Sequence, residues 1–123
     1  MEAADPSVFD DLLAQDVRRV FEEALAASGS PEHATASVLQ AFADSLPDPE
    51  EGPTIWLALA TQQVEHGCLT EHVRLRALEA MDADLVRWAM EGPEALARRQ
   101  QVLASLRSRL IEEAEHEADG DWE

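Results

Sequence analysis

Apolar residues recur at spacings of three and four along almost the whole of this 123-residue chain. This spacing places them on one side of an α-helix, whereas a half-buried β-strand would show strict alternation of apolar and polar residues. The first such stripe contains Phe9, Leu13, Val17 and Phe21. No segment of the sequence alternates in the way that a strand requires. The pattern therefore predicts an all-helical protein.

Start and stop signals divide the chain into helices. Asp5-Pro6 and Ser30-Pro31 each put a capping side chain before a proline, which is favoured at the first position of a helix. Glycine accepts the left-handed conformation that follows many helices, and it occurs at three expected helix ends: Gly29, Gly67 and Gly92. We expect one helical domain over residues 1–111, a compact bundle of about six helices in three hairpins.

Two helices supply much of the expected core. The segment 54–66 is apolar around more than half of its circumference, which predicts a place at the centre of the bundle. The last helix, from Pro93, carries a leucine seam that would pack on another helix of the chain, with the first helix as the expected mate. A homodimer through the last helix is the alternative. The seam contains Leu96, Arg99, Leu103, Leu106 and Leu110.

Arg99 is the charged residue of this leucine seam. An arginine in such a place either pairs with a carboxylate of a partner protein or forms a structural ion pair within the chain. We favour an internal role, which is either such a pair or snorkelling of the aliphatic stem of the arginine to solvent. The candidate carboxylate is Asp16, which lies near the edge of the apolar stripe of the first helix.

The charge of the chain is strongly negative and unevenly distributed. Its 26 acidic residues and nine arginines give a net charge of −17. Residues 1–53 carry −10, residues 54–110 are neutral, and residues 111–123 carry −7. Such a molecule repels nucleic acids and anionic membranes and attracts basic protein surfaces. We therefore expect a basic protein partner, with no direct nucleic-acid or membrane binding.

Residues 112–123 form an acidic tail that is expected to be partly disordered. Like charges four residues apart disfavour a helix, and carboxylates near a helix C-terminus oppose its macrodipole. The tail also holds Trp122 between acidic residues, and tryptophan is a frequent anchor of protein interfaces. The segment 119–123 is therefore either a short linear binding motif or a tolerant terminus without a role.

Two histidines and the single cysteine form the strongest candidate for metal or catalytic chemistry. His66, Cys68 and His72 fall within seven residues, and their side chains are ligands that zinc accepts. Their spacing matches no common zinc site, and Cys68 lacks the flanking residues of a known nucleophile. The favoured interpretation places His66 in the last turn of a helix, Cys68 in a turn and His72 exposed in the next first turn. We predict no catalytic residue, no metal and no cofactor.

Several features indicate a bacterial cytoplasmic protein. The chain has no apolar run near the roughly 20 residues that cross a bilayer, and its first residues lack the pattern of a signal peptide. A lone cysteine, which can form no internal disulfide, suits a reducing compartment. Lysine, asparagine and tyrosine, all with AT-rich codons, do not occur, as expected for a GC-rich genome.

Three sequence elements carry a resemblance to a known group. They are Glu51-Gly52-Pro53, the helix motif Trp56-Leu57-Ala58-Leu59-Ala60, and Val73-Arg74-Leu75-Arg76-Ala77-Leu78, followed by Asp84-Leu85 and Arg87-Trp88. Over about residues 30–110 the chain resembles an uncharacterised bacterial helical domain family. The resemblance implies a helical fold and carries no activity or site residues.

These observations lead to one principal hypothesis and two alternatives. The principal hypothesis is an acidic protein-binding module that neutralises or regulates a basic partner, as an immunity protein, an antitoxin or a nucleic-acid-mimicking inhibitor does. The alternatives are a helical adaptor or oligomeric scaffold that uses the leucine seam, and a small metal-dependent enzyme. The expected partner-binding residues are Asp10, Asp11, Glu22, Glu23, Asp48, Glu50, Glu51, Asp119, Asp121 and Trp122.

Overall fold

A computed structural model describes residues 12–121 of the chain, with side chains from residue 12 to residue 112. Over residues 12–121 it contains five helices and no strand, so the prediction of an all-helical protein is confirmed. The helices are α1 (Leu12–Ser28), α2 (Pro31–Ala41), α3 (Glu51–Glu65), α4 (Glu71–Ala89) and α5 (Pro93–Asp121).

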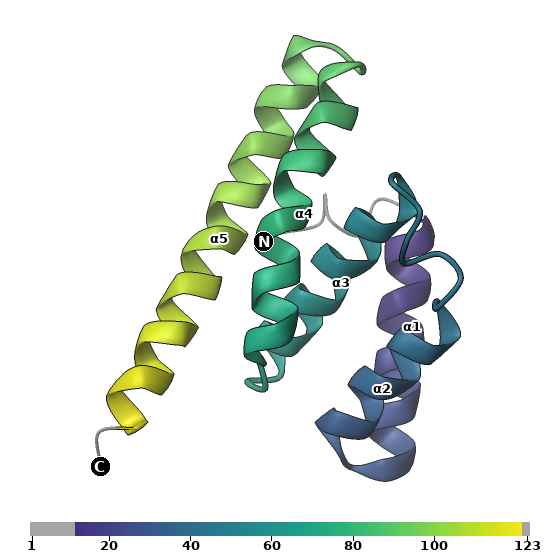
Figure 1. The fold of residues 1–123 in the computed structure, drawn as a ribbon, viewed down its shortest axis with the longest axis vertical. Helices are drawn as coiled ribbons and strands as arrows, with labels where there is room; N and C mark the ends of the chain where they lie inside the picture. Colours follow the sequence, from purple (N-terminus) through teal and green to yellow (C-terminus); the bar gives the residue numbers. More distant parts are fainter. Residues whose placement is uncertain (1–11, 122–123) are drawn as a thin grey trace.

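Helix α3 forms the centre of the structure. The α1–α2 hairpin lies on one side of it and the α4–α5 hairpin on the other (Figure 1). Eleven of the fifteen residues of α3 are buried, which agrees with the prediction that this apolar segment lies inside the bundle. Each hairpin packs its apolar stripe on α3, so both depend on this helix for their core.

The number of helices differs from the expected six. The segments predicted as a fourth and a short fifth helix form one continuous helix, α4. No glycine or proline occurs between Thr70 and Gly92, so nothing in the backbone interrupts this helix. Two hairpins thus flank one central helix, in place of three hairpins. Helix α5 also continues to Asp121, through the segment where fraying was predicted.

The predicted start signals inside the described part act as helix caps. The Ser30 hydroxyl accepts a hydrogen bond from the backbone N–H of His33, at 3.1 Å. The Thr70 hydroxyl accepts one from the backbone N–H of Val73, at 3.4 Å. Each hydroxyl satisfies a donor that the first turn of a helix leaves free. The Asp5-Pro6 signal lies outside the described residues.

Gly52, in the first turn of α3, lies directly against the loop before it. A Cβ atom at this position would collide with the backbone carbonyl oxygen of Leu46. Glycine therefore allows the loop of residues 42–50 to pack on the start of α3. The same loop is held by a hydrogen bond of 2.9 Å from the Gly52 N–H to the Asp48 carbonyl oxygen.

Helix α5 packs mainly along α4, with fewer contacts to α3, so α4 takes the place that the sequence suggested for the first helix. The short turn at Gly92 joins the two helices as antiparallel neighbours. Most of the predicted leucine seam is buried inside the chain, namely Leu103, Leu106 and Leu110. These three leucines therefore pack against other helices of the same chain.

A buried ion pair joins α4 to α5. The Arg99 guanidinium contacts the Asp84 carboxylate through two hydrogen bonds, Nε–Oδ2 at 2.7 Å and Nη2–Oδ1 at 3.0 Å. The exposed fraction is 5% for the Arg99 side chain and 0% for that of Asp84. The guanidinium carbon lies 5.2 Å from the centre of the Trp88 ring, a cation–π distance. The internal ion pair predicted for Arg99 is present.

The partner of Arg99 is Asp84, and the expectation of Asp16 is wrong. Asp16 forms an exposed salt bridge with Arg19, one turn along α1, at 3.2 Å. The difference follows from the packing, because α5 lies against α4, where Asp84 faces the hairpin interface. An exposed pair such as Asp16–Arg19 adds little to stability, whereas the buried pair is held in a fixed two-bond geometry.

Two neighbouring glutamines lie inside the bundle, and their environments differ. The Gln63 amide nitrogen donates to the Thr35 hydroxyl at 2.8 Å, and its oxygen accepts from the backbone N–H of Thr70 at 3.0 Å. Gln63 thereby links α3 to α2 and to the start of α4. Neither amide atom of the fully buried Gln62 has a hydrogen-bond partner among the described residues.

The buried ion pair predicts strongly non-additive mutations. Arg99→Met alone leaves an unpaired buried carboxylate at Asp84, and Asp84→Leu alone removes the buried carboxylate that Arg99 contacts through two hydrogen bonds. Either change should lower the free energy of unfolding by about 3–5 kcal/mol. The double variant Asp84→Leu/Arg99→Met leaves no unpaired buried charge and should lose less than either single variant. Urea denaturation of all four proteins measures this coupling, and additive losses would contradict it.

The unpaired amide of Gln62 predicts a stabilising substitution. Gln62→Met keeps the length of the side chain and removes a buried polar group, so it should raise the free energy of unfolding by about 1–3 kcal/mol. The matched change Gln63→Met removes hydrogen bonds and should lower it. Thermal and urea unfolding give both values. A loss of stability at position 62 would show that its amide has a partner.

Candidate functional site

The three residues considered as alternative metal ligands, His66, Cys68 and His72, do not form a ligand cluster. His66 directly follows α3, and its ring centre lies 5.5 Å from that of Phe21 on α1. His72 is exposed in the first turn of α4, with its ring centre 5.6 Å from that of Trp56. Over the described part of the chain, no group of three or more His, Cys, Asp or Glu side chains could hold a metal ion. Proximity in sequence therefore does not produce a ligand cluster in space.

Cys68 lies half-buried in the turn between α3 and α4. Burial raises the pKa of its thiol. The thiolate is the form that attacks substrates and binds metals, so this environment disfavours both at neutral pH. The geometry resembles that of a structural cysteine more than that of a nucleophile.

A cavity of about 400 Å³ lies beside Cys68. Its polar groups belong mainly to the starts of α2 and α4, and their hydrogen bonds are used within the fold. The Ser30 and Thr70 hydroxyls cap their helices, and the Thr35 hydroxyl accepts from Gln63. The walls are Ser30, Pro31, Glu32, Thr35, Cys68 and Thr70.

The acidic candidates on α1 are exposed to solvent. Glu22 and Glu23 lie on the outer side of the helix and form no ion pair with a described residue. They border a shallow surface depression that also contains arginines, and one of these, Arg19, is bridged to Asp16. Two carboxylates on α1 are thus available to another molecule.

The three partner-binding candidates near the start of α3, namely Asp48, Glu50 and Glu51, have different environments. The Asp48 carboxylate accepts hydrogen bonds from the backbone N–H groups of Glu50, at 2.8 Å, and Glu51, at 3.0 Å. Both hydrogen bonds lower the pKa of Asp48, and the one from Glu51 has the larger effect. Asp48 therefore acts as a cap for α3, while the exposed side chains of Glu50 and Glu51 point to solvent.

The remaining acidic candidates cannot be placed in the same way. Asp10, Asp11 and Trp122 lie outside the described residues. Asp119 and Asp121 belong to the backbone of α5, but their side chains are outside the described part. Their role in partner binding stays a prediction.

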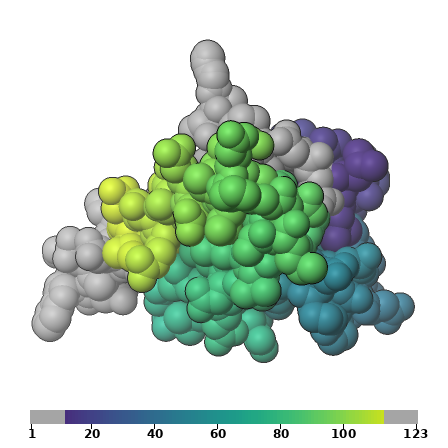
Figure 2. All heavy atoms as spheres, turned by 90° about the horizontal axis from the view of Figure 1, so that it is seen from above, coloured from purple at the N-terminus to yellow at the C-terminus, as the bar shows by residue number. Residues whose placement is uncertain are grey.

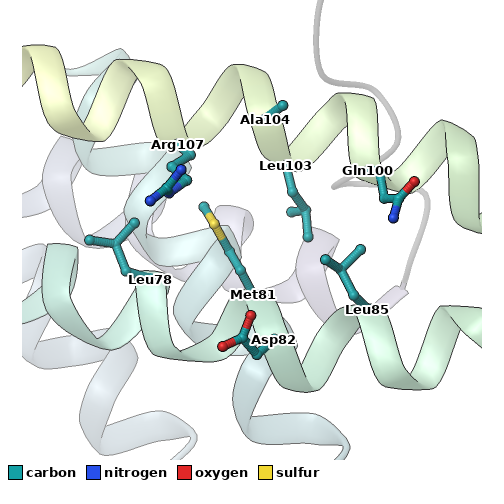
Figure 3. A pocket seen from close by; sticks show the side chains of 8 residues that line it. All are labelled: Leu78, Met81, Asp82, Leu85, Gln100, Leu103, Ala104 and Arg107. Carbon is teal, nitrogen blue, oxygen red and sulfur yellow. The ribbon is translucent and has the colours of Figure 1, made fainter.

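A groove between α4 and α5 is a surface feature that the sequence did not indicate. It encloses about 390 Å³, and its floor and walls are mostly apolar (Figure 3). Asp82 on α4 and Arg107 on α5 lie on opposite sides of it. The lining residues are Leu78, Met81, Asp82, Leu85, Gln100, Leu103, Ala104 and Arg107.

A sequence signal for this groove does exist. Leu78 and Leu85 extend the apolar surface of α4 sideways from its buried stripe, which contains Ala77 and Met81. The contact of α4 with α5 in the hairpin does not cover the whole width of this apolar surface. The width of the apolar stripe on α4 therefore pointed to a second, uncovered contact.

No protein-family model, no curated protein and no solved structure matches this chain. The resemblance of about residues 30–110 to a bacterial helical domain family accordingly stays a prediction. Among the described helices, none combines the length and the apolar character that crossing a bilayer requires.

The cap role of Asp48 predicts a pH-dependent contribution to stability. The lowered pKa of the folded state means that the stabilisation is complete above the unfolded value, about 3.9, and is lost as the pH falls through the folded value. Asp48→Ala should therefore lower Tm at neutral pH, and the difference from the native protein should shrink below about pH 4.

Asp44→Ala is the matched control, because Asp44 is an exposed acid of the same loop without a described hydrogen bond. Thermal unfolding followed by circular dichroism gives Tm at each pH. An equal loss of Tm in both variants would contradict the cap role.

Proposed function

We propose that the protein is a binding module that neutralises or regulates a basic protein partner, in the manner of an immunity protein, an antitoxin or a nucleic-acid-mimicking inhibitor. The observation that carries this proposal is the exposure of its carboxylates. Residues 12–112 contain 16 acidic residues, and of these Asp84 alone is buried. Asp16, Glu71 and Glu79 form exposed salt bridges with described arginines. Most of the negative charge thus remains available to another molecule.

The distribution of charge in the fold supports the same proposal. Between residues 12 and 65, which include α1, α2 and the loop before α3, there are nine acidic residues and two arginines. Residues 71–112, in the α4–α5 hairpin, contain seven of each. Residues 12–65 therefore carry an excess of negative charge, as do residues 113–121 at the end of α5, and residues 71–112 between them are balanced. This excess steers a basic partner within a Debye length of about 8 Å.

The carboxylates most suited to this contact are Glu22 and Glu23 on α1 and Glu50 and Glu51 before α3. They are exposed and form no ion pair with a described residue. Asp48 contributes charge at the same loop but is already engaged with the backbone. The proposal involves binding and no chemical step, so it requires no cofactor or metal.

The proposal predicts a salt-sensitive interaction with basic proteins. The full chain is immobilised, an extract of the host cells is passed over it, and bound proteins are eluted with rising salt and identified by mass spectrometry. We expect a retained protein of basic sequence that elutes at moderate salt. The double variants Glu22→Gln/Glu23→Gln and Glu50→Gln/Glu51→Gln should retain less of it.

Glu71→Gln/Glu79→Gln is the matched control, because it changes the net charge equally but removes carboxylates that pair with the chain's own Arg74 and Arg76. It should retain the partner as the native chain does. Equal losses in all three variants would show a non-specific effect of net charge and would refute the assigned surface. Retention of no basic protein would refute the function.

A further inference from the structure

We propose that the groove between α4 and α5 is an interface at which a second copy of this chain docks, with two-fold symmetry. We call the surface concerned the α4–α5 face. It consists of the groove-lining residues together with the exposed apolar residues Leu75, Val86 and Ile111. The inference does not depend on the acidic surface of α1 and the loop.

The first argument is the apolar character of the α4–α5 face. The exposed fractions are 46% for Leu75, 68% for Val86 and 37% for Ile111, although all three are large apolar residues. Leu75 lies on the side of α4 that also carries Leu78 and Leu85, because these positions differ by three and seven residues. Val86 lies eleven residues, or about three turns, after Leu75 and so extends the same side. An extended apolar surface with a hollow at its centre is typical of an interface.

The second argument is the pair of charges in the groove. Figure 3 shows Asp82 and Arg107 on different helices, on either side of Met81. Neither forms an ion pair with a described residue. A partner that covers the groove must therefore offer a cation to Asp82 and an anion to Arg107, since unpaired buried charges are costly.

A second copy meets this requirement without any further condition. A two-fold axis through the midpoint between the two charges places Asp82 of each copy over Arg107 of the other. Each charge then has one partner, two Asp82–Arg107 pairs form across the interface, and the leucines of the two grooves face each other. The α4–α5 face is thus complementary to itself in charge and in polarity.

The third argument concerns long-range charge, which decides between a second copy and a basic partner. The whole chain has a charge of −17, so two copies repel each other through most of their surfaces. Residues 71–112 of the α4–α5 hairpin, which contain the groove, are balanced, with seven acidic residues and seven arginines, whereas residues 113–121 at the end of α5 add five acidic residues. Figure 2 shows α4 and α5 side by side, with α1 and α2 beyond them. Docking through the groove keeps α1 and α2 of the two copies apart, and the balanced charge of residues 71–112 gives a basic partner little net attraction there.

The size of the α4–α5 face suits a modest dimer. Helix α4 has 19 residues and is therefore about 28 Å long, and two packed helices together are about 20 Å wide. A footprint of that order approaches the accessible area of about 800 Å² that each partner buries in a standard interface.

Sedimentation velocity of the full chain over a concentration series, at an ionic strength of about 0.15 M, tests the proposal. We expect the mass of two chains at the upper concentrations and of one chain at the lower. Asp82→Arg or Arg107→Asp should raise the dimer Kd about a hundredfold or more, because symmetry creates two like-charge contacts at once. The double reversal Asp82→Arg/Arg107→Asp should restore the dimer.

Arg98→Asp is the matched control, since Arg98 lies nine residues from Arg107 and hence on the opposite side of α5. It makes the same change of charge and should leave the Kd unchanged. Circular dichroism verifies that each variant is folded. A monomer at every concentration, or a double reversal that remains monomeric while folded, would refute the proposal and leave the test of the acidic surface unaffected.

Discussion

The buried ion pair between Asp84 and Arg99 determines how the second half of the molecule is arranged. A fully buried carboxylate is tolerated only where a fixed cation neutralises it, so Asp84 requires α5 to lie in one register along α4. Leucines alone would allow neighbouring registers, because they pack in several of them with similar energy. The register in turn places Asp82 and Arg107 on either side of one groove. A contact inside the hairpin thus defines the surface outside it.

Much of the helical organisation could be predicted from local chemistry. Ser30-Pro31 and Thr70 begin helices because their hydroxyls accept backbone hydrogen bonds, an effect that involves residues only three apart. The central position of α3 follows from an apolar character that no exposed helix could sustain. The predicted number of helices was wrong, because the sequence analysis assigned two helices to the segment that forms α4. That segment contains no glycine or proline that would interrupt a helix. The partner of Arg99 was beyond sequence reasoning, because several carboxylates are compatible with any one arginine until the helix packing is known.

The candidate site shows the same division between local and distant effects. Composition indicated an excess of exposed carboxylates, and the described residues from 12 to 112 retain it. It could not indicate that Asp48 uses its carboxylate on the backbone while Glu50 and Glu51 do not. His66, Cys68 and His72 were the only metal candidates that sequence spacing offered, and over the described residues they do not form a group that could hold a metal ion. The α4–α5 groove forms only where the two helices pack together, and its one sequence signal was the width of the apolar stripe on α4.

Gly52 has a consequence for the acidic side of the molecule. Its hydrogen atom occupies the place where any larger residue would press on the Leu46 carbonyl, so the chain can turn tightly from the loop into α3. Glu50 and Glu51, just before this glycine, are therefore held in a fixed position by the packing of the loop on α3. A Gly52→Ala substitution would push the loop away from the start of α3 and displace both carboxylates, although it changes neither glutamate. The orientation of the charged surface is thus set by the smallest residue in its vicinity.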